Sequence, residues 1–227
     1  MKKLELYLFV IFVTFLLPLF ISLKTIDPGL FPRFILLALS AVIIEAIAIV
    51  RIVREGLSKN HTVGISSLHY FLGGYLLFTA LSLLKAVNSA ESIFEILRVA
   101  LFVIGTIIAF RIINRSEKDR IVVIKTIIMT SLLVALLGIM EYWGVFQLTD
   151  CGEFAFPSST MGNRNLLSSY LFLCSGFVLF GLFRFTGTWY YINIFTCSAI
   201  MYVLCSGYAR AVETDKSFEL RLWAVSR

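Results

Sequence analysis

Residues 150–165, which read DCGEFAFPSSTMGNRN, form a polar segment directly before an apolar run that starts at Leu166. The segment ends with two amide side chains and a guanidinium, at Asn163, Arg164 and Asn165. Backbone N–H groups at a helix N-terminus attract anions, so this arrangement predicts a site for an anionic group or a sugar. Local physics favours a plainer role, in which Asn163 or Asn165 caps the helix and Arg164 lies at the lipid headgroups.

Two ionisable residues lie inside apolar runs, where a charge is costly and therefore indicates function or pairing. Glu45 precedes Arg51 by six residues and Lys125 follows Ile121 by four. At roughly 1.5 Å per residue both lie less than about 10 Å from the same predicted boundary. This similar depth predicts a structural ion pair of Glu45 with Lys125. Alternatively, Lys125 extends to the interface and Glu45 meets water or Arg51. His69 is placed at the same interface rather than in a proton path.

The elements that carry these residues belong to a very apolar chain. It has 227 residues, of which 59% are hydrophobic and only 15% charged. This composition excludes both a soluble globular domain and a disordered chain. Several apolar runs reach the roughly 17–25 residues that a membrane-spanning helix needs. We therefore predict an all-α fold, a polytopic membrane helix bundle of about seven transmembrane helices. The predicted spans lie near residues 6–23, 34–50, 68–84, 93–110, 121–140, 166–183 and 189–204.

Local signals refine two of these spans, and composition separates the rest of the chain from them. Asn88 and Glu91 have capping-box spacing, which predicts that the fourth helix begins near Ser89. Pro18 is expected to kink the first span. Residues 1–204 are then the transmembrane bundle, and residues 205–227 are a polar C-terminal tail.

The distribution of Lys and Arg predicts the orientation. With the N-terminus inside, ten of them fall in the inner segments and five in the outer loops. Four more in the tail weaken this difference, but the early spans usually dominate. We expect a multi-pass protein of the bacterial inner membrane with a cytoplasmic N-terminus, and no binding of nucleic acid. The cysteines lack metal-ligand spacing, and Cys151 and Cys205, both on the outer side, are a conceivable disulfide.

Two motifs resemble those of a known family. Residues 159–167, STMGNRNLL, followed by SSYL, resemble the GT-x-G-N-x-N-x-x-A-x-L signature of the O-antigen ligase and O-antigen polymerase superfamily. Ser159, Ser168 and Tyr170 replace the usual Gly, Ala and Leu. Residues 205–211, CSGYARA, are similar to the family's T-x-S-R-A/G motif at the outer end of the following helix.

This resemblance implies an enzyme that needs no metal and no cofactor. Such a ligase moves a glycan from a polyprenyl-diphosphate carrier to lipid A-core or a similar acceptor in the synthesis of lipopolysaccharide. Arginines neutralise the diphosphate leaving group, since the guanidinium fork suits phosphate oxygens. By position, Arg210 is then the catalytic residue, and Asn163, Arg164 and Asn165 bind substrate. The related alternative is an O-antigen polymerase.

The chain also departs from the family pattern. Members continue with further helices and an outer domain that supplies another arginine and a histidine. We therefore expect a truncated or frame-disrupted member, or one half of a split protein whose second chain supplies the missing part. Two alternatives stay open: a non-catalytic membrane subunit, and a small-solute transporter that uses Glu45, Lys125 and His69.

Overall fold

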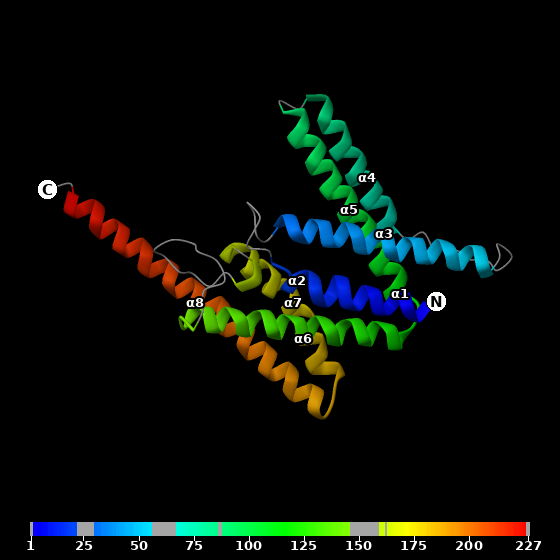
Figure 1. Ribbon diagram of the computed structural model, residues 1–227. Helices are drawn as coiled ribbons and strands as arrows, with labels where there is room; N and C mark the ends of the chain where they lie inside the picture. The colour runs from blue at the N-terminus through cyan, green and yellow to red at the C-terminus, as the bar shows by residue number, and fades with distance from the viewer. Residues whose placement is uncertain are drawn as a thin grey trace. The chain divides into compact units, whose positions relative to one another are not determined.

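The structure is a computed structural model that describes residues 2–21, 30–55, 67–85, 88–145, 159–161 and 163–225, with the backbone alone from residue 207. Within these ranges every regular element is a helix, so the predicted all-α class is confirmed there (Figure 1). The chain divides into two compact units. Unit 1 comprises Met1–Val13 and Arg33–Val123, and unit 2 comprises Thr14–Pro32 and Ile124–Arg227.

Unit 1 contains α1 (Lys2–Leu8), most of α3 (Leu30–Glu55), α4 (Ser67–Ser82), a 3-10 turn (Leu83–Lys85) and α5 (Ser89–Ile113). Helices α4 and α5 form an antiparallel hairpin, in which the His69 ring meets the Phe110 ring at a centroid distance of 5.2 Å. Helices α3 and α5 run in the same direction, because Phe34 packs against Phe94 near their first turns and Glu45 meets Arg111 further along. These directions are those expected when successive spans alternate across a bilayer.

Unit 2 contains α2 (Leu17–Leu19), most of α6 (Glu117–Tyr142), the 3-10 turn η3 (Ser159–Met161), α7 (Arg164–Arg184) and α8 (Thr188–Val225). A turn through Gly187, at φ +64°, reverses the chain between α7 and α8. The two helices pack against each other, and α8 extends beyond α7 (Figure 1). A Cβ at Gly138 would lie 3.5 Å from Leu167 and 3.7 Å from Val203, so α6, α7 and α8 meet at one layer.

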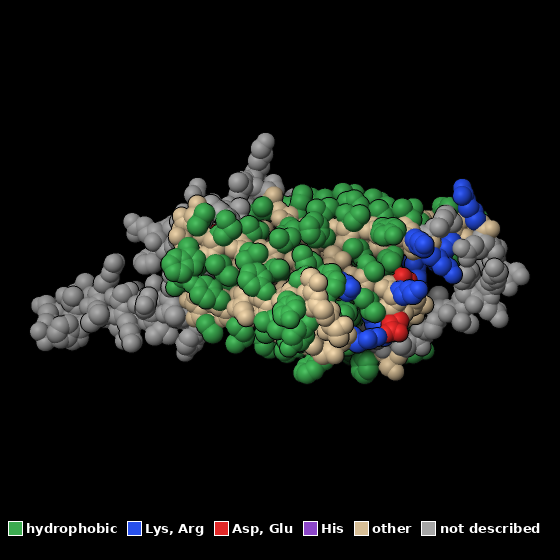
Figure 2. Space-filling model, turned by 90° about the horizontal axis from the view of Figure 1, so that it is seen from below, with side chains coloured by type: hydrophobic (Ala, Val, Ile, Leu, Met, Phe, Trp, Pro, Cys, Tyr) green, Lys and Arg blue, Asp and Glu red, His purple; other side chains and the backbone are tan. Residues whose placement is uncertain are grey.

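Among the residues that the structure describes, five helices are long and apolar enough to cross a membrane. Four of them cover the predicted spans 34–50, 93–110, 121–140 and 166–183, and the fifth covers 189–204; their bounds are Pro32–Arg54, Ala90–Ile113, Glu117–Tyr142, Asn165–Arg184 and Thr188–Ser206. Hydrophobic side chains cover most of the described surface in Figure 2. Apolar helices with apolar outer faces indicate a membrane protein.

The remaining two predicted spans differ from a plain membrane helix, so the predicted total of about seven is not confirmed. The first is helical from Lys2 to Leu19, but a π-helix (Phe9–Leu16) interrupts it. Helix α4, the third predicted span, has only 16 residues before the 3-10 turn. It nevertheless exposes large side chains, with Phe71 at 79% and Phe78 at 74% exposed.

The ends of individual helices can be compared with the capping and proline signals in the sequence. Asn88 caps α5, its side chain accepting a hydrogen bond from the backbone N–H of Glu91, and the predicted start at Ser89 is confirmed. Pro18 lies in the first turn of α2, directly after the π-helix. Helix α8 does not end with the seventh predicted span at residue 204 but continues to Val225, so the predicted tail is helical along most of its length.

Candidate functional site

The first half of the family-like motif is a buried structural turn. In η3, Ser159 is fully buried and Thr160 is 4% exposed. The backbone N–H of Ser159 donates a hydrogen bond to Glu141 Oε2 at 2.6 Å, and Ser159 Oγ donates to the Val134 carbonyl at 3.0 Å. Thr160 Oγ1 donates to the Pro18 carbonyl at 2.7 Å. Three hydrogen bonds thus tie this turn to α6 and α2.

Ser159 has a backbone conformation that favours glycine. Its φ is +48°, in the left-handed region, and it is the one non-glycine residue with positive φ among the residues that the structure describes. A Cβ in this region costs roughly 1–2 kcal/mol. The resembled family has Gly at this position. The hydrogen bond from Ser159 Oγ to Val134 offsets part of that cost, which explains how a serine is accommodated.

The second half of the motif begins α7. Asn163 is the N-cap, and its Oδ1 accepts a hydrogen bond from the backbone N–H of Asn165 at 2.8 Å. The structural alternative for Asn163 is therefore confirmed. Asn163 and Asn165 are both exposed. Their role in binding substrate stays a prediction, as does that of Arg164, whose side chain lies outside the described residues.

These features define one end of unit 2, called here the motif end: Pro18, Glu141, η3 and Asn163. Arg210 lies on α8 beyond the layer of Gly138, Leu167 and Val203. It follows Val203 by seven residues, or about 10 Å along a helix, and Asn163 precedes Leu167 by four, or about 6 Å. Because α7 and α8 are antiparallel, Asn163 and Arg210 lie on the same side of the layer. The described part of Arg210 is its backbone.

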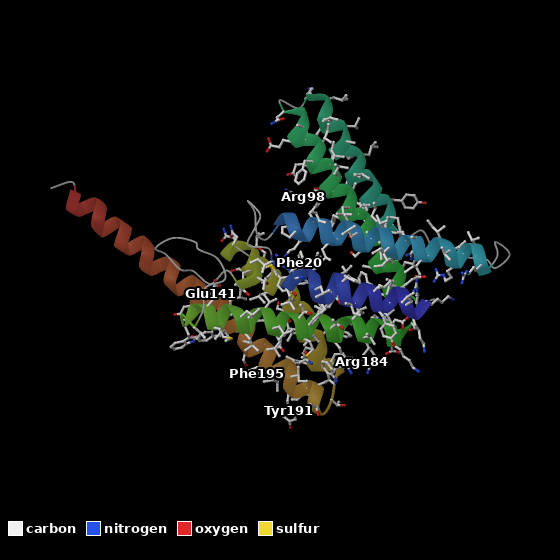
Figure 3. All side chains as sticks on the ribbon, in the orientation of Figure 1. Phe20, Arg98, Glu141, Arg184, Tyr191 and Phe195 are labelled. Atoms are coloured by element: carbon white, nitrogen blue, oxygen red, sulfur yellow. The ribbon has the colours of Figure 1, made fainter. Side chains whose placement is uncertain are left out.

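Glu141 is a residue of this site that we did not single out from the sequence. Its side chain is only 5% exposed, at the last turn of α6 (Figure 3). Its position in the sequence could have indicated a structural role, because a carboxylate at the end of an apolar run must find hydrogen-bond donors or water. The sequence does not reveal which group pairs with Glu141, because Ser159 lies 18 residues further along the chain.

The two intramembrane ions of the sequence analysis have other neighbours than the predicted ones. Glu45 Oε2 lies 2.9 Å from Arg111 Nη1, within unit 1. Lys125 Nζ lies 4.5 Å from the centre of the Trp189 ring and 5.3 Å from that of Phe185, within unit 2. Each is thus compensated inside its own unit, Glu45 by a guanidinium and Lys125 by aromatic faces. The structure replaces the predicted mutual ion pair with these two interactions.

A second group of charges gathers in unit 1. Glu5 is fully buried, and its carboxylate pairs with Arg51, at 3.0 Å, and with Arg115. Arg115 also donates to the Lys2 carbonyl at 3.2 Å. We call Glu5, Arg51 and Arg115, with the neighbouring Glu45–Arg111 pair, the basic cluster. It joins α1 to the C-terminal ends of α3 and α5, which the sequence analysis placed on the inner face.

Comparison with known proteins finds no family model, no curated protein and no solved structure that matches the chain. Among the described residues, no three His, Cys, Asp or Glu side chains gather in a group that could hold a metal ion. Cys151 lies outside the described residues, and with it the conceivable disulfide to Cys205.

Proposed function

We propose that this chain is a membrane glycosyltransferase of the O-antigen ligase type. In this proposal it transfers a glycan from a polyprenyl-diphosphate carrier to lipid A-core or a similar acceptor. It lies in the bacterial inner membrane with a cytoplasmic N-terminus, so that the motif end faces the periplasm. The O-antigen polymerase reaction uses the same donor and is the alternative.

One observation carries the proposal. The buried η3 turn presents Asn163 and Asn165 at the exposed start of α7, on the same side of unit 2 as the backbone of Arg210. The residues that the resemblance assigns to substrate and catalysis therefore belong to one end of one unit. A site for a lipid-linked donor requires such an arrangement, because the diphosphate stays at the membrane surface while the prenyl chain stays in the bilayer.

The transfer reaction requires mainly that positive charge and hydrogen-bonding groups are held at the right positions. The acceptor hydroxyl attacks the anomeric carbon, the bond from that carbon to the diphosphate oxygen breaks, and the hydroxyl proton is lost to a base or to water. Negative charge develops on the departing diphosphate. Arg210, with Arg164 as a second cation, stabilises that charge, since fixed donors aimed at developing charge lower the barrier. Asn163 and Asn165 orient a sugar or the loop that holds it.

The test has two measurements. The first is binding of undecaprenyl diphosphate to the detergent-purified chain, which Arg210→Ala should weaken at least about tenfold, as expected for a lost charge-assisted contact. Arg184→Ala, which removes the same charge at the opposite end of α7 from Asn163, is the control and should leave binding unchanged. Binding that is equal in all three proteins would refute the donor site.

The second measurement is surface glycan in hosts that lack either the ligase or the polymerase. Restoration in the ligase-deficient host, lost with Arg210→Ala, supports the ligase assignment. Restoration only in the polymerase-deficient host would replace it with the alternative. Normal glycan display with Arg210→Ala would remove the catalytic role of Arg210.

A further inference from the structure

The basic cluster of unit 1 holds more positive charge than its carboxylates balance. Three guanidiniums, those of Arg51, Arg111 and Arg115, face two carboxylates. Glu5 receives two of these guanidiniums, and Glu45 receives the third. Exposed basic side chains nearby in the sequence add to the excess: Lys2, Lys3, Arg54, Lys118 and Arg120, against the exposed Glu117 and the half-buried Asp119.

Several donors in the cluster have no acceptor among the described residues. Arg51 is only 6% exposed, and its buried Nε has no hydrogen-bond partner. Its Nη1 lies 3.0 Å from Glu5 Oε1, which is also without a hydrogen bond, so these two atoms form an ion pair and Nη1 is not counted among the donors without an acceptor. Nε and Nη2 of Arg111 are likewise buried without an acceptor. Buried N–H groups without acceptors are costly, so an arrangement of this kind indicates that something else supplies oxygens.

The chemistry of these donors selects a phosphate. A guanidinium presents a planar fork that matches two phosphate oxygens, and it is weakly hydrated, so it tolerates partial burial. The donors lie at the ends of α3 and α5, both of which are long and apolar enough to span a membrane. The end of a membrane helix is where lipid phosphates lie.

Apolar surface next to the cluster distinguishes a lipid from a free anion. On α3, the turns that carry Arg51 also expose Ile49, at 59%, and Val53, at 74%. A free phosphate gains nothing from this surface, whereas the acyl chain of a phospholipid covers it. We propose that the basic cluster of unit 1 binds the headgroup phosphate of an anionic phospholipid. This proposal is independent of the glycan transfer above, because it concerns other residues and another ligand.

The test is titration of the detergent-purified full chain with dioleoylphosphatidylglycerol, dioleoylphosphatidylcholine and inorganic phosphate, with bound molecules counted by native mass spectrometry. Phosphatidylglycerol should bind about fivefold more tightly than phosphatidylcholine, the effect of roughly one basic residue near an anionic surface. Equal binding of the two lipids would overturn the proposal. Inorganic phosphate that binds as tightly as phosphatidylglycerol would overturn the assignment to a lipid.

Three variants locate the site. Arg111→Gln should weaken binding of phosphatidylglycerol about fivefold, whereas Arg98→Gln, the same change toward the opposite end of α5 (Figure 3), should not. Glu45→Gln should strengthen binding, because it releases Arg111 from its carboxylate. A gain of affinity cannot arise from misfolding, so Glu45→Gln tests the site even where Arg111→Gln fails to fold. Unchanged or weakened binding in Glu45→Gln, or equal losses in Arg98→Gln and Arg111→Gln, would refute the proposed site.

Discussion

The backbone N–H of Ser159 donates a hydrogen bond to the carboxylate of Glu141, at an N···O distance of 2.6 Å. This bond joins the last turn of α6 to the turn that precedes α7, and both groups are buried. The position of the family-like motif therefore depends on a residue outside the motif.

Glu141→Ala removes the acceptor for the Ser159 N–H and should lower the free energy of unfolding by about 1–3 kcal/mol, the cost of a buried donor left unpaired. Glu141→Gln retains an acceptor oxygen and should lie between Ala and the wild type. Thermal unfolding of the detergent-purified chain, followed by tryptophan fluorescence, measures the order. Glu95→Ala is the control, since Glu95 is about half exposed in a surface pair with Arg98 and should cost at most about 1 kcal/mol. A larger loss at Glu95 than at Glu141 would contradict the role of this bond.

At position 159 a glycine variant should be more stable than an alanine variant, which is the reverse of their order inside a helix. Ser159→Gly loses the hydrogen bond to Val134 but relieves the left-handed backbone, whereas Ser159→Ala loses the bond and keeps the strain. Gly should thus be the more stable variant by about 1 kcal/mol. Ser175 on α7 is a matched control, because its hydroxyl also bonds a backbone carbonyl but its backbone is helical. At position 175 the alanine variant should be more stable than the glycine variant by about 1 kcal/mol. The same order at both positions would show that φ at Ser159 does not control stability.

Much of the local structure could be predicted from the sequence, and the tertiary partners could not. Asn88 and Asn163 cap their helices as their spacing indicates, because a cap depends on residues two or three positions away. Partner choice depends on distant segments. Glu45 was assigned to Lys125 by depth alone, but depth says nothing of which face of a helix meets which neighbour, and the structure pairs Glu45 with Arg111.

The predicted number of spans is not confirmed, for a related reason. A hydropathy window sees apolar residues, not the hydrogen-bond register that makes the first segment a π-helix over Phe9–Leu16. The window also placed the end of the last span where charges begin, near residue 204. Helix α8 continues to Val225, because charged residues such as Glu, Lys and Arg propagate a helix as well as apolar ones do.

Gly181 is required by the close approach of α7 and α8. A Cβ added there would overlap the amide of Asn193 on α8, with its Cγ 2.8 Å away. Asn193 is fully buried and its Nδ2 donates to the Trp189 carbonyl at 2.6 Å, so it has little freedom to move. Gly181→Ala should therefore destabilise the chain by about 1–3 kcal/mol.

The control for Gly181 is Gly176→Ala on the same helix, which meets nothing within 4 Å and should be neutral or stabilising by up to about 1 kcal/mol. In the double variant Gly181→Ala with Asn193→Ala, the loss should be smaller than the two single losses added together, since the clash is absent. Thermal unfolding of the wild type, the two single variants at 181 and 193, their double variant and Gly176→Ala measures both effects. Additive losses would mean that the two side chains do not interact.

The two ends of α7 should be reachable from opposite sides of the membrane. Asn165 lies exposed in its first turn, and Thr186 lies exposed just after its last, on the side that the Lys and Arg distribution assigns to the cytoplasm. In a chain whose four native cysteines are replaced by serine, a membrane-impermeant maleimide added to intact spheroplasts should label Asn165→Cys. Thr186→Cys and Lys118→Cys should be labelled only after permeabilisation. Labelling of Asn165→Cys solely from the cytoplasm would place the motif end on the wrong side for a lipid-linked donor and would remove the transferase proposal, whereas the basic cluster would then bind lipid of the outer leaflet.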